Sequence, residues 1–426
     1  MSPLGDAKEG RGGMRLDTAL QGVKVLDLTW HIAGPYCSKL LADFGADVIK
    51  VERPATGDPA RAIGPFLNDE PHLEKSGLFL HLNTNKRSVT LDLKHPHARD
   101  ITQGLVEWAD IVVENFSPRV LPLLGLSYQT LASWNPRVLL VSISNFGQTG
   151  PYRDYRAEDL TIYAMGGPML MTGTPELPPS RLGLNVVLYQ GGAAAALATV
   201  TALVGAELRG RGEHVDVSLY ETQMGTQDRR VSGLVGYQYT GTTFTRRPAG
   251  AGIASGVKPC KDGYINLVGA GVRFSRIVTM LGKPEILKDP RFATPEARTL
   301  PENVQAFEEE YVLPWLSERT MEEAWAAAQA VGVLSGPVFT VRDIVEREHF
   351  VGRGAFAALD HPVAGRLMYP SRPFIMMETP SLLEQRPGSP VCRPAPLLGQ
   401  HNREVYHGLL GLSQSELDAL SAAGVI

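Results

Sequence analysis

The chain has 426 residues, of which 43% are hydrophobic and 20% are charged, with 41 basic and 45 acidic side chains. At typical domain sizes of about 100–200 residues, this length predicts two or three domains, each with a sizeable core. The net charge of −4 excludes a general nucleic-acid or polyanion binder, because such proteins carry a strong basic excess. A local basic site for one small phosphorylated ligand stays open.

The cysteines and the apolar runs indicate the cellular compartment of the protein. Cys37, Cys260 and Cys392 have no metal-ligand spacing, and their odd number favours a reducing compartment. The most apolar run, residues 191–206, is Ala-rich and shorter than the ~20 residues of a membrane span. The first residues lack an apolar signal core, so residues 1–20 are expected to be a disordered leader. The composition predicts a soluble, cytoplasmic protein.

Short β-rich runs alternate with helical stretches in the first half of the chain. We expect strands over residues 23–28, 47–52, 88–93, 111–114, 137–144 and 214–219. We expect helices over residues 35–44, 97–108, 128–134 and 191–209. Strands and helices that alternate in this way predict βαβ units and a mostly parallel, doubly wound α/β sheet.

The second half predicts a smaller α+β region followed by a helical tail. The region begins with a strand over residues 263–267, and its helices are expected over 274–281, 303–316 and 320–330. A hairpin is expected over residues 360–370, and Ser413 with Glu416 forms a capping box that predicts a terminal helix.

The local motifs of well-known active sites are absent. The sequence has no G-x-S-x-G, no P-loop lysine motif and no H-E-x-x-H. The run Gly250-Ala251-Gly252 does not lie between a strand and a helix, so it is no dinucleotide fingerprint. Residue patterns alone therefore indicate a soluble α/β enzyme and no particular reaction.

Four longer blocks identify a family. They are GVKVLDLTWHIAGPYCSKLLADFGADVIKVER at residues 22–53, NTNKRSVTLDLK at 83–94, VENFSPRVLPLLGL at 113–126 and RAEDLTIYAMGGPMLMTG at 156–173. Their order and joint presence resemble the class III CoA-transferase family, also called CaiB/BaiF, which includes α-methylacyl-CoA racemases. The resemblance extends from about residue 22 to the C-terminus.

The resemblance implies a domain organisation and an assembly. A large Rossmann-like domain with a parallel sheet is expected over residues 21–225, followed by a linker over 226–250. A small α+β domain is expected over 251–340, and residues 341–426 would return to complete the large domain. The family forms an interlocked homodimer, so a second copy of this chain is the expected partner, without nucleic acid or membrane.

The resemblance also implies a nucleophile. In this family an aspartate attacks the donor thioester, giving a mixed anhydride and then an aspartyl-CoA thioester. The matching position is Asp159, in the run Ala157-Glu158-Asp159-Leu160, whereas Glu158 and Asp154 do not align with it. The ordinary role for such a residue is a first-turn acid that complements the dipole of the following helix.

The resemblance further implies residues that stabilise negative charge and bind CoA. Backbone N–H groups of glycine-rich turns are expected to face the developing oxyanion; these glycines are Gly166, Gly167, Gly250 and Gly252. The expected CoA contacts are His31, Ile32, Ala33, Arg53, Leu82, Asn115 and Phe116. CoA enters as a substrate, and neither a permanently bound cofactor nor a metal is implied.

Two positions depart from the family pattern. Leu123 stands where some members carry an arginine, so Arg119, Lys86 or Arg87 would have to make that phosphate contact. Trp30 stands where many members carry an arginine or a histidine, which would reshape the pocket.

Three alternatives to transfer between two acids stay open. A racemase needs bases on both faces of the α-carbon, but Glu158 replaces the histidine of that subfamily, and residues 185–190 contain no carboxylate. Intramolecular CoA transfer within a dicarboxylic acid would use the same aspartate. A noncatalytic CoA-binding protein is the third, and the retention of Asp159 argues against it.

Overall fold

The computed structural model describes residues 18–225, 230–243, 246, 252–269, 271–384 and 392–426. They form two compact units. The larger unit contains the described residues within 18–169, 181–242 and 349–426, and the smaller unit those within 170–180 and 243–348. Most of the expected leader and part of the expected linker lie outside the described residues.

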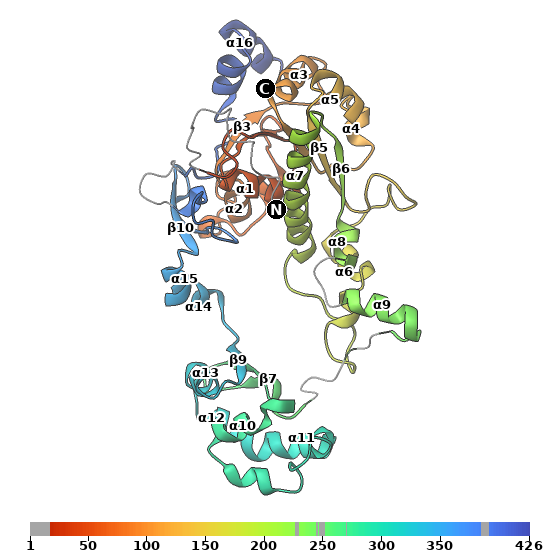
Figure 1. The fold of residues 1–426 in the computed structure, drawn as a ribbon. Helices are drawn as coiled ribbons and strands as arrows, with labels where there is room; N and C mark the ends of the chain where they lie inside the picture. The colour runs from red at the N-terminus through yellow and green to blue at the C-terminus, as the bar shows by residue number, and fades with distance from the viewer. Residues whose placement is uncertain (1–17, 226–229, 244–245, 247–251, 270, 385–391) are drawn as a thin grey trace, which may run out of the picture. The chain divides into compact units, whose positions relative to one another are not determined.

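A six-stranded parallel sheet forms the centre of the larger unit (Figure 1). Its strands are β1 (Lys24–Asp27), β2 (Asp47–Glu52), β3 (Lys86–Thr90), β4 (Ile111–Glu114), β5 (Leu139–Ser144) and β6 (His214–Ser218). They lie in the order β3-β2-β1-β4-β5-β6. The inner strands are apolar runs buried on both faces, as is typical of a parallel sheet covered by helices. The predicted α/β fold with a parallel sheet is confirmed.

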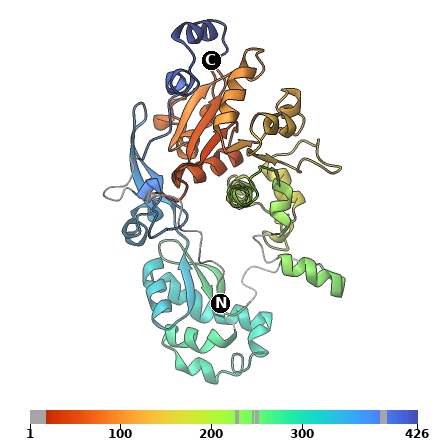
Figure 2. The same cartoon turned by 45° about the horizontal axis from the view of Figure 1, so that its top comes forward.

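Two layers of helices cover this sheet. On one face α1 (Ala33–Asp43) and α7 (Val186–Arg209) share a core with Val25, Val113 and Val141. On the other face α3 (Ala98–Trp108) packs with the C-terminal residues Tyr406 and Leu417. The last helix, α16 (Gln414–Ala422), begins with the predicted capping box at Ser413. Figure 1 and Figure 2 both show this tail, in dark blue, close to the orange part of the chain that contains β3 and α3.

The remaining helices of the larger unit are short. They are α2 (Gly77–Leu82), α4 (Val120–Leu123), α5 (Tyr128–Trp134), α6 (Asp159–Met165), α8 (Leu219–Gly225), α9 (Arg230–Thr240) and α15 (Glu348–Gly352). The predicted hairpin consists of β10 (Phe356–His361) and β11 (Gly365–Pro370), and it begins four residues before the expected start.

The longest helix, α7, differs from the expectation at its N-terminus. It begins at Val186 rather than residue 191, because contacts with Asp159 and α1 outweigh the weak helix propensity of its β-branched first residues. At 24 residues α7 has the length and apolarity of a membrane span. Val187, Ala195 and Ala202 are nevertheless buried in the core of the sheet layer, so α7 is a core helix.

The smaller unit is an α+β fold with its own core. Its strands β7 (Ser255–Pro259), β8 (Tyr264–Val268) and β9 (Leu334–Pro337) form an antiparallel sheet. Its helices are α10 (Phe274–Leu281), α11 (Pro301–Phe307), α12 (Leu313–Ser317), α13 (Met321–Ala330) and α14 (Val341–Glu346). The single helix expected over 303–316 is interrupted by a π-helical turn at Glu308–Val312, since Pro314 cannot donate an intrahelical hydrogen bond.

Close approach of α1 and α7 depends on Gly192. A Cβ atom at this position would lie 2.5 Å from the carbonyl oxygen of Ala33 and 3.1 Å from the ring of Tyr36. We expect Gly192→Ala to lower the free energy of unfolding by about 1–3 kcal/mol through overpacking. Gly205→Ala, on the same helix, meets only the flexible end of Arg209 and should raise it by about 0.5–1 kcal/mol. Urea denaturation tests both, and equal midpoints for the two variants would contradict this packing role.

Candidate active site

The strand order determines where a ligand binds. The connections from β1 and β4 lead to opposite sides of the sheet, so a crevice opens beyond the carboxyl ends of these neighbouring strands. The residues that follow β1 are Thr29, Trp30 and His31, and those that follow β4 are Asn115 and Phe116. Three of these five, His31, Asn115 and Phe116, are expected CoA contacts, and the fold brings the two loops to one crevice.

A cavity of about 1190 Å³ occupies this part of the larger unit. Its lining includes most of the residues predicted for the site, which are His31, Ile32, Ala33, Asn115, Phe116, Arg119 and Asp159. This volume exceeds that of ordinary drug-sized pockets, roughly 300–1,000 Å³, and suits a ligand with the bulk of CoA.

Asp159 is the first residue of α6, and its carboxylate faces a second helix. Its Oδ2 accepts the backbone N–H of Leu188 at 3.1 Å, and the neighbouring N–H of Val187 is a further influence that lowers the pKa of the carboxyl group. These are N–H groups of the first turn of α7, which have no partner within the helix. The side chain of Asn185 makes no capping hydrogen bond, so Asp159 performs that role from a distant part of the chain.

Two opposing influences act on the Asp159 carboxyl. Burial raises its pKa, whereas the N–H groups of Leu188 and Val187 and the positive charge of Arg181 lower it; the net pKa lies above the ordinary value of 3.8. The carboxyl group is half-buried and is held in a fixed orientation on the cavity wall. This is the setting of a desolvated, oriented carboxylate.

The loop between β1 and α1 is attached to the loop after β4 by one side chain. Asn115 Oδ1 accepts the backbone N–H of Trp30 at 2.9 Å, and Asn115 Nδ2 donates to the carbonyl of Trp30 at 2.8 Å. Two hydrogen bonds from one amide fix both the position and the rotation of the Trp30 peptide. Asn115 therefore fixes the position of the segment that leads into α1.

Trp30 lies between two residues predicted to bind CoA. Its ring packs edge-on against Phe116 at 5.2 Å between centroids, and the guanidinium of Arg53 lies 4.0 Å from its ring centroid. A cation over an indole face is held by the ring quadrupole. Arg53 is exposed and does not line the cavity, so this stacking fixes its position at the rim of the crevice.

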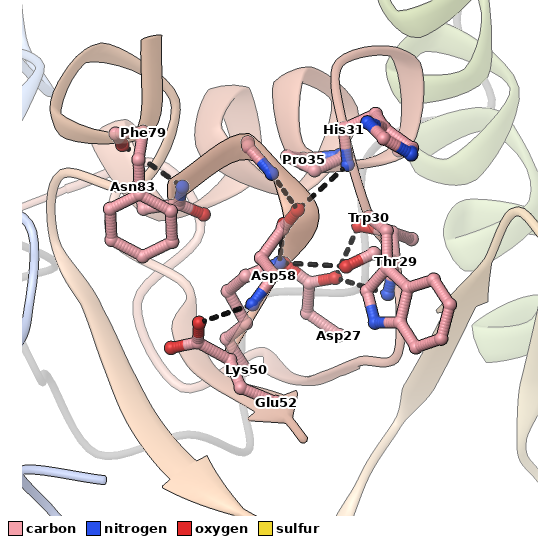
Figure 3. Close-up of polar contacts among 12 residues, drawn as sticks. Asp27, Thr29, Trp30, His31, Pro35, Lys50, Glu52, Asp58, Phe79 and Asn83 are labelled. Carbon is pink, nitrogen blue, oxygen red and sulfur yellow. Dashed lines mark hydrogen bonds and ion pairs between the residues drawn. The ribbon is translucent and has the colours of Figure 1, made fainter. Parts of the chain in front are cut away.

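Buried charges support the loop from below (Figure 3). Asp58 Oδ1 accepts the backbone N–H of His31 at 3.0 Å, and Asp58 Oδ2 lies 2.8 Å from Lys50 Nζ. Lys50 also donates to the carbonyl of Thr29 at 2.7 Å. His31 itself has a φ of 64°, a conformation that costs energy for a side chain other than glycine. The ion pair beneath it holds this residue in place.

The basic residues considered for a phosphate contact have different surroundings. Lys86 is fully buried against Asp27 and Ser38, so it has no surface for a phosphate. Arg87 pairs with Asp47 and Glu404. Arg119 lines the cavity and forms a two-point pair with Asp154, in which its Nε lies 2.8 Å from Oδ1. Of these three, only Arg119 reaches the site.

Glu114, at the end of β4, adds a buried acid behind the cavity wall. Burial raises its pKa to about 7, although the Ser142 hydroxyl and the Phe116 N–H oppose this shift. Its Oε2 accepts the Phe116 N–H at 2.8 Å. Glu114 thus fixes the main chain at Phe116.

Several predicted site residues are not among those that line the cavity. Gly166 and Gly167 close the C-terminal end of α6, where their N–H groups donate to Ile162 and Ala164, so the structure does not bring them to Asp159. Leu82 is fully buried in α2 and has no surface for a ligand. Gly252 belongs to the smaller unit, and Gly250 lies outside the described residues.

Three contributors to the site are absent from the residues predicted from the sequence, and they are the N–H groups of α7, Asp58 and Arg181. For Asp58 a local signal exists, because Asp58-Pro59 is an N-cap followed by proline, and the structure shows this cap. The hydrogen bond between Asp159 and α7 joins residues 29 positions apart and has no local signal.

A sequence profile described as CoA-transferase family III matches residues 20–402 of this chain. The chain belongs to this family. Its relatives include a succinyl-CoA–D-citramalate CoA-transferase from Chloroflexus aurantiacus, 35% identical over 96% of this chain and 98% of the relative. A formyl-CoA:oxalate CoA-transferase from Streptomyces avermitilis is 33% identical over 96% of this chain and 99% of the relative.

Two solved structures agree with the fold. A CaiB/BaiF family protein from Brucella suis shares 30% identity with a TM-score of 0.80 over 92% of this chain and all of its own. A Mycobacterium tuberculosis protein shares 26% identity with a TM-score of 0.74 over 91% of this chain and 99% of its own. The protein is a class III CoA-transferase, an enzyme of acyl-CoA metabolism whose substrates are CoA thioesters.

Proposed function

We propose that this class III CoA-transferase moves CoA from an acyl-CoA to a free carboxylic acid through covalent intermediates on Asp159. The observation that carries the proposal is the Asp159 carboxylate, held by the first turn of α7 on the wall of a CoA-sized cavity. The relatives support transfer between two acids, since each is named for one CoA thioester and one free acid.

The reaction proceeds in balanced steps. An oxygen of the Asp159 carboxylate attacks the thioester carbonyl, the C–S bond breaks, and CoA thiolate leaves an aspartyl mixed anhydride. The thiolate then attacks the Asp159 carbonyl and releases the donor acid, which leaves an aspartyl-CoA thioester. The acceptor carboxylate attacks this thioester and displaces the thiolate. The thiolate finally attacks the acceptor carbonyl of the second anhydride and releases the Asp159 carboxylate.

The first turn of α7 supplies the electrostatic support for these steps. The N–H group of Leu188 that holds the carboxylate, with that of Val187 beside it, would hold the carbonyl oxygen of Asp159 in the anhydride and the thioester. Fixed N–H donors near developing negative charge contribute strongly in a desolvated site. This support replaces the role expected of Gly166 and Gly167.

CoA would bind along the crevice between β1 and β4. Asn115 and the stacked pair of Trp30 and Phe116 would position its pantetheine arm, and Arg53 and Arg119 would lie near its phosphates. This assignment combines the crevice with the residues implied by the family. The homodimer stays a prediction, which light scattering coupled to size-exclusion chromatography tests.

Loss of the Asn115 amide is expected to weaken CoA binding. Asn115→Ala removes two hydrogen bonds that fix the Trp30 peptide, so the KM for acyl-CoA should rise about 5- to 50-fold. Asn115→Asp keeps an acceptor for the Trp30 N–H and loses the donor, so its KM should lie between those of Asn115→Ala and the wild type. Steady-state kinetics measure both, and an unchanged KM in Asn115→Ala would argue against this positioning role.

The pH dependence follows from the state of the Asp159 carboxyl. Because burial raises its pKa above 3.8 and only the carboxylate is nucleophilic, kcat/KM should fall as the pH drops, with a midpoint above 3.8. A pH profile of kcat/KM for the acyl-CoA donor measures this limb. Full activity maintained below pH 3.8 by a folded enzyme would contradict it.

Trapping of the intermediate tests the proposal against its alternatives. Incubation with an acyl-CoA and no acceptor, followed by hydroxylamine or borohydride, should modify the peptide that contains Asp159, as read by mass spectrometry. Exchange of the α-proton in deuterated water without CoA transfer would indicate a racemase. CoA binding with neither reaction would indicate a noncatalytic protein.

A further inference from the structure

The residues that line the cavity include more arginines than acidic side chains. Four arginines line it, which are Arg119, Arg153, Arg156 and Arg181, together with the acids Asp154, Glu158 and Asp159. Arg119 is engaged by Asp154. Within the part of the chain that the structure describes, Arg153, Arg156 and Arg181 form no ion pair shorter than 4.0 Å. The cavity wall therefore has a net positive charge, which favours the binding of anions.

These arginines act at different places. Arg119 follows Phe116 by three residues and pairs with Asp154, the neighbour of Arg153, so both cations lie near the segment that follows β4. Arg181 lies elsewhere. Burial raises the pKa of Asp159, but the charge of Arg181 is among the influences that lower it. Arg181 also lines the cavity together with Asp159, and it lies five residues before Val186, where the helix that holds the Asp159 carboxylate begins, so it belongs to the nucleophile's side of the cavity.

The anion that Arg181 receives is not a CoA phosphate, because the pantetheine arm of CoA is too long. When the thioester carbon contacts Asp159, the whole pantetheine arm separates it from the diphosphate. A cation at the nucleophile therefore meets the acyl group rather than the nucleotide. A guanidinium presents paired N–H donors that match a carboxylate, and Arg181 is exposed to the cavity.

We infer that Arg181 binds a second carboxylate on the acid substrate, so that this enzyme transfers CoA between dicarboxylic acids. The inference rests on the proposed role of Asp159 as the nucleophile. One carboxyl group of the substrate reacts at Asp159 while the other is held by Arg181. A monocarboxylic acid of the same length leaves the guanidinium without its ligand and binds less tightly.

Matched substrates and variants test the inference. Transfer is measured with succinyl-CoA against butyryl-CoA, and with glutaryl-CoA against valeryl-CoA, in which a methyl group replaces the second carboxylate. Wild-type kcat/KM should favour the dicarboxylic member of a pair by about 10- to 100-fold, the range of a hydrogen-bonded charge. Arg181→Gln should abolish this preference by lowering only the dicarboxylic value, and Arg181→Lys should restore part of it.

Arg153→Gln is the matched control, because it removes another arginine from the same wall. It should change both members of a pair by the same factor and leave the preference intact. Equal wild-type rates within each pair, or equal losses for both members in Arg181→Gln, would overturn the inference while the role of Asp159 stands. If none of the four thioesters transfers CoA or modifies Asp159, the proposed function fails and the inference fails with it.

Discussion

Asp159→Asn should lower kcat for CoA transfer by at least about 10⁴-fold, the scale on which loss of a covalent nucleophile reduces turnover. The amide oxygen of asparagine still accepts the N–H of Leu188, so the first turn of α7 keeps its cap and the protein should fold. Asp159→Glu moves the carboxylate by one methylene and should cost about 100-fold, because reaction geometry tolerates little displacement.

Glu158→Gln is the matched control for this pair of variants. Glu158 is the exposed neighbour of Asp159, and its side chain makes no capping hydrogen bond, so its kcat should remain within about threefold of the wild type. Thermal unfolding of all three variants separates catalysis from stability. Substantial turnover by a folded Asp159→Asn would show that another group carries the acyl transfer.

Asp27→Asn should destabilise the larger unit by about 3–5 kcal/mol, the cost of leaving a buried charge without its partner. Asp27 is fully buried, and its Oδ2 accepts Lys86 Nζ at 3.0 Å and Ser38 Oγ at 2.6 Å. Burial alone would raise the pKa of Asp27, but the charges of Lys50 and Lys86 hold it well below its ordinary value of 3.8. The substitution keeps the volume and removes the charge.

The destabilisation has a defined pH dependence. A carboxylate whose pKa is lowered by folding stabilises the native state above its unfolded pKa, about 3.9, and loses this contribution as the pH falls. The difference between the wild type and Asp27→Asn should therefore shrink below about pH 4. Combination with Lys86→Gln should recover part of the loss, since no buried charge then lacks its partner.

Urea denaturation measures these free energies through the midpoint at an unchanged slope. Asp360→Ala is the control, because it breaks an ion pair between the exposed side chains of Asp360 and Arg366 and should leave the midpoint unchanged. Equal urea midpoints for Asp27→Asn and Asp360→Ala would show that the buried contacts of Asp27 with Lys86 and Ser38 do not stabilise the protein.

The sequence predicted the sheet because its strands are apolar runs bounded by turns, and period and composition are local properties. It predicted the core of the candidate site because Asp159, Asn115 and Phe116 lie inside family blocks. For Gly166 two roles stay open in the sequence, since glycine in a turn is equally suited to facing an oxyanion and to closing a helix, and the structure shows this glycine at the end of α6 beside Gln223.

Other features depend on contacts between distant segments. The capping of α7 by Asp159, the ion pair of Lys50 with Asp58 and the burial of Lys86 all arise from tertiary packing. A basic residue such as Lys86 has the same sequence signature whether it binds a phosphate or neutralises a buried aspartate. Only the fold separates these roles.

The most direct test of the central claim follows oxygen atoms from the acceptor acid to the enzyme. In the proposed sequence, the bridging oxygen of the second anhydride comes from the acceptor, and it stays on Asp159 when the thiolate attacks the acceptor carbonyl. A single turnover with an acceptor labelled with heavy oxygen in its carboxylate should therefore place one labelled oxygen on the peptide that contains Asp159, and repeated turnover should label both oxygens of the carboxylate. An unlabelled Asp159 peptide after complete turnover would contradict covalent transfer through this residue.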